Sequence, residues 1–361
     1  MAKASAVEIE AGGRAVRVSS PDRVVYEATD RTPAITKLDV CRYVAEVGEA
    51  MMRGLGERPT AMERWPDGWR EGMRLGTGPR DPDGDGFYQK RLPRGAPDYV
   101  RTVEVTFPSG RTAEELCPSE PAALVWAAQM GTLTFHPWPV RRADVDRPDE
   151  LRLDLDPQPG TDFADARRVA LVARDLLAEL GLRGYAKTSG NRGVHVYVRI
   201  DPRYSFEQLR HAAIGFGRAL EQRDDGVTTA WWKEERGERV FLDFNQNNRD
   251  RTIAGAWSLR ARPGGPVSTP LTWDDLAGLE DPRDLNLTTV PARLAEHGDP
   301  WEGMDAEAFA LEPLLELWET LPGGELNFPP DYPKMPGEPP RVQPSKKVAE
   351  HWDADGNRIA D

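Results

Sequence analysis

Hydrophobic and polar residues alternate most regularly in three short segments near the middle of the chain. These segments are LRLDLD (151–156), VHVYVRI (194–200) and RVFLDF (239–244). Alternation with a period of two is typical of strands that bury one face. Between the segments, apolar residues recur at helical spacing over about 162–180 and 206–222. Helices that alternate with strands predict an α/β or α+β fold, with central sheets flanked by helices.

The N-terminal third has a more mixed pattern. A short leader is expected to run into a strand that ends at VRVSS (16–20). Apolar spacing predicts helices over about 37–54 and 120–130, and residues 108–110 (PSG) are typical of a hairpin turn. Segment 65–86 is rich in Gly, Pro, Arg and Asp, which predicts a long loop.

Together these elements predict one folded unit over residues 1–328. We expect an N-terminal part to about residue 118 and a core over about 119–328. Residues 329–361 are polar and Pro-rich, which predicts an extended tail that docks a partner or covers the sheet.

Composition narrows the class of protein. The chain has 361 residues and 11 Trp, with 39% hydrophobic residues, as expected of a globular protein rather than a disordered one. Cys41 and Cys117 stand far apart, which disfavours a disulfide framework or a cysteine-rich zinc site. No apolar run is long enough to span a membrane and the N-terminus lacks a signal core, so we expect a cytoplasmic protein. The net charge of -13 lowers the expectation of a nucleic-acid binder, although Arg-rich segments recur locally.

The strand at 151–156 carries the strongest chemical signal. Alternation sends three leucines to the core and places Arg152, Asp154 and Asp156 together on the other face. Two carboxylates on one face repel each other unless a cation lies between them, and Mg²⁺ prefers such oxygen ligands. The alternative is a solvated strand edge on which Arg152 balances the charge, and the spacing alone leaves both interpretations open.

Asp243, in VFLDF, extends this signal. On the predicted strand it faces away from Val240, Leu242 and Phe244. With Asp154 and Asp156 it would complete three carboxylates, which is enough to bridge two metal ions in phosphoryl transfer.

Two further segments have the composition of a phosphate-binding site. In SGNRGVH (189–195), two glycines let the backbone approach a phosphate and Arg192 adds positive charge. An ordinary polar turn is the alternative. Arg260 and Arg262 alternate on one face if their segment is extended, which suits bidentate phosphate binding, and a solvated basic edge is the alternative.

Other motifs are excluded. Segment 81–86 (DPDGDG) opens like a calcium loop, but the twelfth position is Leu92 rather than Glu. The sequence has no GxxxxGK[ST] and no GxGxxG pattern in the Gly-rich loop. His136 could contribute to a site or pack in the core.

Taken in order, the motifs resemble one known family. They are DLDP (154–157), SGNRGVH (189–195), FLDF (241–244) and SLRAR (258–262). This set resembles the primase-polymerase domain of bacterial ligase D, of the archaeo-eukaryotic primase superfamily. The likeness extends over most of the chain, from SPDR (20–23) to VPARL (290–294).

The resemblance implies a role for each motif. Asp154, Asp156 and Asp243 would hold two Mg²⁺ or Mn²⁺ ions. An NTP or dNTP would be bound by Ser189, Arg192, His195, Thr252, Arg260 and Arg262. The resemblance therefore implies a polymerase that adds ribo- or deoxyribonucleotides to a DNA primer.

The resemblance also implies a DNA surface that recognises a downstream 5′-phosphate. Arg23 and Lys37 match two basic positions of that surface, whereas a third is Glu63, which is expected to repel phosphate. Phe87 and Tyr88 match an aromatic pair placed against DNA, and residues 69–84 resemble an insertion beside it.

No KxDG motif of a ligase occurs, so we expect a stand-alone polymerase chain rather than a ligase fusion. We also expect a monomer that fills short gaps in bacterial DNA repair, in the cytoplasm at the nucleoid. End joining with Ku and a ligase is the first alternative. A non-catalytic binding module and a metal-dependent phosphoesterase or nuclease are the others.

Overall fold

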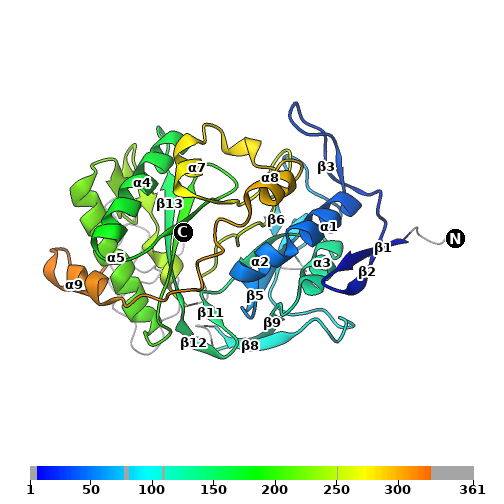
Figure 1. Ribbon diagram of the computed structural model, residues 1–361, viewed down its shortest axis with the longest axis horizontal. Coiled ribbons are helices and arrows are strands. Elements are labelled where there is room, and N and C mark those ends of the chain that lie inside the picture. The colour runs from blue at the N-terminus through cyan, green and yellow to red at the C-terminus, as the bar shows by residue number, and fades with distance from the viewer. Residues whose placement is uncertain (1–5, 77–80, 108–109, 250, 327–361) are drawn as a thin grey trace.

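The computed structural model describes residues 6–76, 81–107, 110–249 and 251–326. The fold is mixed α/β, as predicted: two six-stranded sheets lie side by side and helices cover their outer faces. In Figure 1, α1, α2 and α3 lie to the right, while α4 and α5 lie to the left of the sheet that contains β13. The predicted tail at 329–361 lies outside the described residues.

The first sheet has the strand order β6-β7-β5-β9-β8, and β10 pairs with β5. Its strands are β5 (Thr60–Arg64), β6 (Leu75–Gly76), β7 (Gly86–Gln89), β8 (Thr102–Thr106), β9 (Thr112–Leu116) and β10 (Thr132–Pro137). Strands β8 and β9 form the predicted hairpin, whose turn residues 108–109 lie outside the described residues. The expected boundary near residue 118 lies between β5 and β10, which pair with each other. The two parts therefore share one sheet, and their division stays a prediction.

The second sheet has the order β16-β17-β13-β15-β14-β18 and is antiparallel except between β16 and β17. Its strands are β13 (Glu150–Pro157), β14 (Tyr185–Thr188), β15 (Val194–Arg199), β16 (Val227–Thr228), β17 (Val240–Leu242) and β18 (Pro270–Leu271). Helices α4 (Phe163–Glu179) and α5 (Phe206–Arg223) pack on one face, where the three leucines of β13 are fully buried. The opposite face is left for the polar residues of the same strands.

The remaining elements complete the two ends of the molecule. Around the first sheet are β1 (Ala6–Ala11), β2 (Arg14–Ser19), β3 (Val24–Tyr26), β4 (Ile35–Thr36), α1 (Lys37–Glu46), α2 (Gly48–Leu55) and α3 (Pro121–Gln129). Later in the chain come β11 (Val140–Arg141), β12 (Asp144–Pro148), α6 (Lys233–Arg236), η1 (Phe244–Asn247), α7 (Trp273–Gly278), η2 (Pro282–Asp284), α8 (Val290–His297) and α9 (Glu312–Thr320).

Three details differ from the sequence prediction. The helix expected over 37–54 is divided at Val47, which ends α1 as its C-cap and precedes α2. The segment expected to be a long loop contains the short strand β6. Arg152 shares a face with Asp154 but does not balance its charge, because its guanidinium bonds Glu150 Oε2 at 2.7 Å.

A buried ion network fixes the two sheets to each other. Arg58, just before β5, is fully buried and bonds both carboxylate oxygens of Asp149 at 2.5 and 2.8 Å. It also pairs with Glu150 at 2.8 Å, and Arg199 of β15 pairs with the same two acids. Paired buried charges hold their geometry tightly, since breaking one partner leaves the other uncompensated.

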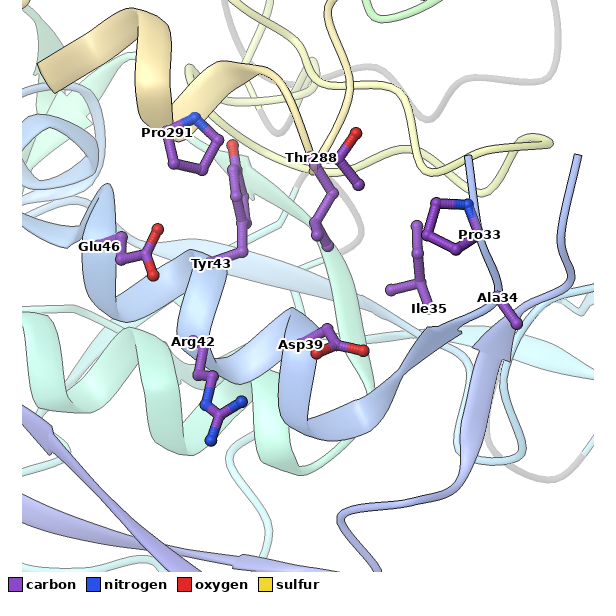
Figure 2. Close-up of a pocket in the computed structure, with 10 residues that line it drawn as sticks. Pro33, Ala34, Ile35, Asp39, Arg42, Tyr43, Glu46, Thr288 and Pro291 are labelled. Carbon is purple, nitrogen blue, oxygen red and sulfur yellow. The ribbon is translucent and has the colours of Figure 1, made fainter. Parts of the chain in front are cut away.

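Segments from opposite ends of the chain also meet. Figure 2 shows Tyr43 of α1 directed toward Pro291 of α8, beside a pocket of about 280 Å³. The Tyr43 hydroxyl donates to the Trp257 carbonyl at 2.7 Å. This pocket contains none of the predicted site residues.

In the described ranges, none of the helices combines the length and the apolar character needed to cross a membrane. Cys41 and Cys117 are both buried and free.

Candidate active site

Three carboxylates meet where β13 pairs with β17. Asp154 and Asp156 lie two residues apart on β13, and the register of the pair sets Leu155 opposite Leu242. Asp243 follows β17 directly, and its backbone N–H donates to the Asp154 carbonyl at 2.9 Å. The sequence placed Asp243 on the strand, but it is the N-cap of η1 because its Oδ1 accepts the Asn245 N–H at 3.0 Å.

Burial and the charge of Asp154 raise the pKa values of the clustered acids. Burial raises the pKa of Asp154 to about 6. The charge of Asp154, followed by burial, raises the pKa of Asp156 to about 7. Burial and then the charge of Asp154 raise the pKa of Asp243 to about 7. Mutual repulsion of this kind is what a bound cation relieves.

The donor set fits divalent cations of the magnesium type. Asp154 Oδ1 is buried and accepts no hydrogen bond, although His195 Nε2 lies 3.2 Å away. Across the described residues, no three His, Cys, Asp or Glu side chains already enclose one ion position. Mg²⁺ is commonly held by one or two carboxylates plus substrate phosphates and water, so the acids fit a site that the nucleotide completes.

His195 stands beside Asp154 on the neighbouring strand. The β13–β15 register sets the two residues opposite each other, with 3.2 Å between His195 Nε2 and Asp154 Oδ1. Behind the imidazole, the buried Lys187 lies 2.8 Å from Nδ1 and bonds Ser268 Oγ at 2.5 Å. Burial lowers the pKa of both Lys187 and His195.

The glycine-rich loop closes over the end of β13. Ser189 Oγ accepts the N–H groups of Asn191 at 3.2 Å and Gly193 at 3.0 Å. These two N–H groups are therefore already engaged within the loop. Gly190 has φ +71°, and a Cβ there would lie 2.5 Å from Arg260 Cγ, so only glycine fits beside this arginine.

Among the predicted nucleotide-binding cations, Arg260 has the most central position. Its Nη1 donates to the Ser189 carbonyl at 2.9 Å. Its positive charge offsets part of the rise in the pKa of Asp154 and Asp156. The charge of Arg192 likewise offsets part of the rise in the pKa of Asp156, and Arg192 Nη2 lies 3.5 Å from the Pro157 carbonyl oxygen. The structure places Arg262 at an exposed turn and leaves Thr252 half-buried.

The first sheet supplies a second wall. Glu63 of β5 is 6% exposed and bonds Trp65 Nε1 at 2.9 Å and His136 Nε2 at 3.1 Å. The Tyr88 ring meets His136 edge to face, with 5.2 Å between centroids. The charge of Arg260 lowers the pKa of both Glu63 and His136, so this wall lies within electrostatic reach of the loop.

Arg23 and Lys37 lie together on the other side of the same strands. Arg23 bonds the Pro66 carbonyl at 2.5 Å, and Lys37 approaches Gln129 Oε1 at 3.4 Å. Burial lowers the pKa of Lys37, and the charges of Arg23 and Arg64 lower it further. We call Arg23, Lys37 and Arg64 the basic cluster.

The alternation of β5 corrects the expectation for Glu63. Arg64 lies on the side of Arg23 and Lys37, with its guanidinium 5.3 Å from the centroid of the Phe87 ring. Glu63 lies on the other side and contacts His136. The carboxylate therefore does not oppose a phosphate at the cluster. By the same alternation, Phe87 and Tyr88 point to opposite faces of β7.

Sequence reasoning missed three residues that the fold brings to these surfaces. Arg64 and Lys187 lie next to segments that were identified, but their partners are distant in sequence. The Arg236 guanidinium of α6 lies 3.4 Å from the centroid of the Phe241 ring. Burial lowers the pKa of Arg236, and the charges of Asp243 and Asp156 oppose that shift. Only the position of Lys187, two residues before Ser189, could have suggested a role.

Comparison with known proteins gives a consistent match. A family profile described as "LigD, primase-polymerase domain" matches residues 36–301. The chain is 32% identical over 303 residues to the "Multifunctional non-homologous end joining protein LigD" of Pseudomonas aeruginosa, covering 83% of this chain and 34% of that protein. It is 27% identical over 292 residues to the bifunctional LigD of Bacillus subtilis, covering 79% of this chain and 43% of that protein.

A solved structure also matches. The polymerase domain of Mycobacterium tuberculosis ligase D in complex with DNA aligns with a TM-score of 0.70 and 32% sequence identity. The alignment covers 81% of this chain and 99% of that domain. The chain thus spans about a third of the length of the Pseudomonas protein but nearly all of one polymerase domain.

Proposed function

Because the chain belongs to the family of LigD primase-polymerase domains, we propose that it is a DNA-dependent primase-polymerase that extends a primer with ribo- or deoxyribonucleotides. The observation that carries this proposal is the meeting of Asp154, Asp156 and Asp243 beside His195 and Arg260. Clustered acids next to phosphate-binding cations are the composition that nucleotidyl transfer needs.

In this proposal, Asp154, Asp156 and Asp243 hold two Mg²⁺ or Mn²⁺ ions together with the nucleotide. Bound ions would lower the pKa of the attacking hydroxyl and stabilise the charge on the leaving phosphate. The raised pKa of each acid favours this role, since a cation would replace the protons that they otherwise retain.

The protein's own groups bind and orient the triphosphate. Arg260 is held by Ser189, and Arg192 lies at the same loop, so both offer guanidinium groups to phosphate oxygens. His195 presents Nε2–H on the acid side because Lys187 bonds Nδ1. Ser189 fixes the loop, and Thr252 and Arg262 are proposed as further nucleotide contacts.

The basic cluster is proposed to bind the downstream 5′-phosphate of a gap. Lys37 is half-buried and approached by neutral oxygens, and the charges of Arg23 and Arg64 both act on it. A phosphate would relieve this repulsion, and Phe87, beside Arg64, would pack near the DNA. Such capture favours filling of short gaps during repair.

We also propose the setting of this activity. The relatives are bacterial end-joining proteins named LigD, so Ku and a DNA ligase are candidate partners and end joining is the alternative pathway. The bacterial cytoplasm, at the nucleoid, is the proposed location and a monomer the proposed state. Boundaries at residues 118 and 328 are kept as proposed divisions of the domain.

Two other functions are less well supported. A non-catalytic binding module has no use for three clustered carboxylates, two of which have a pKa raised by the charge of the third, Asp154. A nuclease or phosphoesterase could use the acids but would not need the Ser189 loop with Arg260.

Extension of a labelled primer across a short gap tests the proposal. The reaction contains Mn²⁺, ribo- or deoxyribonucleotides, and DNA with or without a downstream 5′-phosphate. Extension that falls at least about 100-fold in the variant Asp154→Ala/Asp156→Ala is expected. Unchanged extension in that variant, with Glu179→Gln on the exposed face of α4 as control, would remove the assignment.

A further inference from the structure

One buried acid of the second wall has no part in the chemistry proposed above. Glu63 receives hydrogen bonds at both oxygens, from Trp65 at Oε1 and from His136 at Oε2. Burial favours the protonated acid, but these bonds, with the charge of Arg260, outweigh burial and lower the pKa of Glu63. A carboxylate that is kept ionised inside the fold requires its partners in fixed positions.

The ionised carboxylate determines the tautomer of His136. Burial lowers the pKa of His136, so the imidazole is neutral and carries one ring proton. That proton lies on Nε2, because Nε2 is 3.1 Å from the Glu63 oxygen. Nδ1 is then an acceptor, and no residue in the described part of the chain donates to it.

Other groups of the same wall depend on this arrangement. Tyr88 meets the His136 ring at an interplanar angle of 78° and is one of the few exposed large hydrophobic side chains. Glu63 and Arg260 act on each other electrostatically, and Arg260 also acts on Asp154 and Asp156. Thr134 of β10 donates its hydroxyl to the Leu259 carbonyl at 2.8 Å, so the wall lies beside the segment that carries Arg260.

We propose that Glu63 is a positioning residue of the nucleotide site. It holds His136 with Nδ1 available to a polar donor of the nucleotide, supports Tyr88 through the imidazole, and balances part of the charge of Arg260. This deepens the proposed function and rests on it. The negative side chain at this position, where the family resemblance led us to expect a basic one, is thus accounted for by the face of β5 that it occupies.

The variant Glu63→Gln separates positioning from packing. Glutamine keeps the shape and an oxygen for the Trp65 indole, but its NH₂ meets the Nε2–H of His136, donor against donor. His136 then has to change tautomer or move. The KM for ATP in gap extension is expected to rise about 10-fold, with kcat changed less than about twofold.

A second buried acid provides the control. Glu115 on β9 is fully buried and accepts the Trp138 indole N–H at 3.1 Å, as Glu63 accepts that of Trp65. Glu115→Gln should leave the KM for ATP unchanged, whatever it does to the melting temperature. An equal rise in KM in this variant would assign the effect of Glu63 to packing and overturn the proposal.

The variant His136→Ala tests the route of action. If Glu63 acts through His136, His136→Ala alone raises KM to a similar extent and Glu63→Gln adds little in its presence. Additive effects would overturn the proposal. A normal KM in His136→Ala would overturn it even if Glu63→Gln did not fold. Thermal melts check that each variant is folded.

Binding without DNA distinguishes this inference from the polymerase assignment. Titration of the protein with fluorescent mant-ATP and Mn²⁺ should show about 10-fold weaker binding for Glu63→Gln than for wild type and Glu115→Gln. Failure of the wild type to extend primers would remove the polymerase function but leave this measurement intact. Equal affinity in all three proteins would overturn the role of Glu63.

Discussion

Lys187 and His195 face each other across β14 and β15, with 2.8 Å between Lys187 Nζ and His195 Nδ1. The same histidine lies opposite Asp154 across β13 and β15. Three adjacent strands thus align a buried amine, an imidazole and a carboxylate. An amine that donates to Nδ1 places the ring proton at Nε2, on the side of the acid.

Lys187 should therefore act through His195. In Lys187→Met the bond to Nδ1 is lost and either tautomer becomes available, so extension should fall about 10-fold while the protein remains folded. The check is a double-mutant cycle with His195→Ala, measured as kcat/KM together with thermal melts. Full additivity of the two losses would contradict the link.

Asp243 should make the stability of the metal-free protein depend on pH. Its pKa is about 7 when folded, against 3.8 for an ordinary Asp, so the folded state retains a proton that the unfolded state releases. The stabilising contribution is complete below pH 4 and is lost as the pH rises through 7. Asp243→Asn should therefore raise the melting temperature at pH 8 by roughly 5 °C, and change it little at pH 4.

Divalent metal supplies the complementary measurement. At pH 8 the acids are ionised and Mn²⁺ should raise the melting temperature of the wild type, whereas at pH 5.5 protons compete and the rise should be smaller. Asp243→Asn should reduce the rise at pH 8. The opposite order of the two pH values would show that Mn²⁺ binds elsewhere.

Arg260 should matter more than Arg262 for the nucleotide. Arg260 is anchored by Ser189 and acts on the acids, while Arg262 is exposed at a turn. Arg260→Ala is expected to raise the KM for ATP about 10- to 100-fold, and Arg262→Ala less. Steady-state extension at several ATP concentrations tests this, with Arg283→Ala on the exposed η2 as control; a larger effect at Arg262 would contradict the order.

The basic cluster should control the preference for a 5′-phosphate. Lys37→Ala and Arg64→Ala should each weaken binding of 5′-phosphorylated gapped DNA about 10-fold, and of unphosphorylated DNA far less. Fluorescence anisotropy with both DNAs measures the difference. Arg42→Ala is the matched control, because Arg42 is an exposed cation on the same helix as Lys37.

Local pattern was sufficient where one strand carried the whole signal. The period of two along β13 predicted that the leucines are buried and that Asp154 and Asp156 share the opposite face. The helices after β13 and β15 followed from apolar spacing and begin with capping boxes at Asp162 and Ser205. These features depend on residues only a few positions apart.

Long-range pairing accounts for what the sequence could not predict. The direction of Glu63 depends on β5 lying between β7 and β10, and β10 is about 70 residues away. In the alternative interpretation Arg152 balances the acids, but Glu150, one alternation earlier on the same strand, is its partner. The first contact is a tertiary one, whereas Glu150 and Asp154 both lie two residues from Arg152, so the local pattern could not decide between them.

The pairing of β5 with β7 gives the two surfaces a common partition one backbone thick. Glu63 and Tyr88 face the proposed nucleotide side, and Arg64 and Phe87 face the basic cluster. Substitutions can change the side chains on one face without changing those on the other. They cannot change the distance between the two faces, because the backbone of the paired strands sets it. Insertion of a single residue into β5 would exchange the two faces, so evolution can tune each surface separately only while the register is preserved.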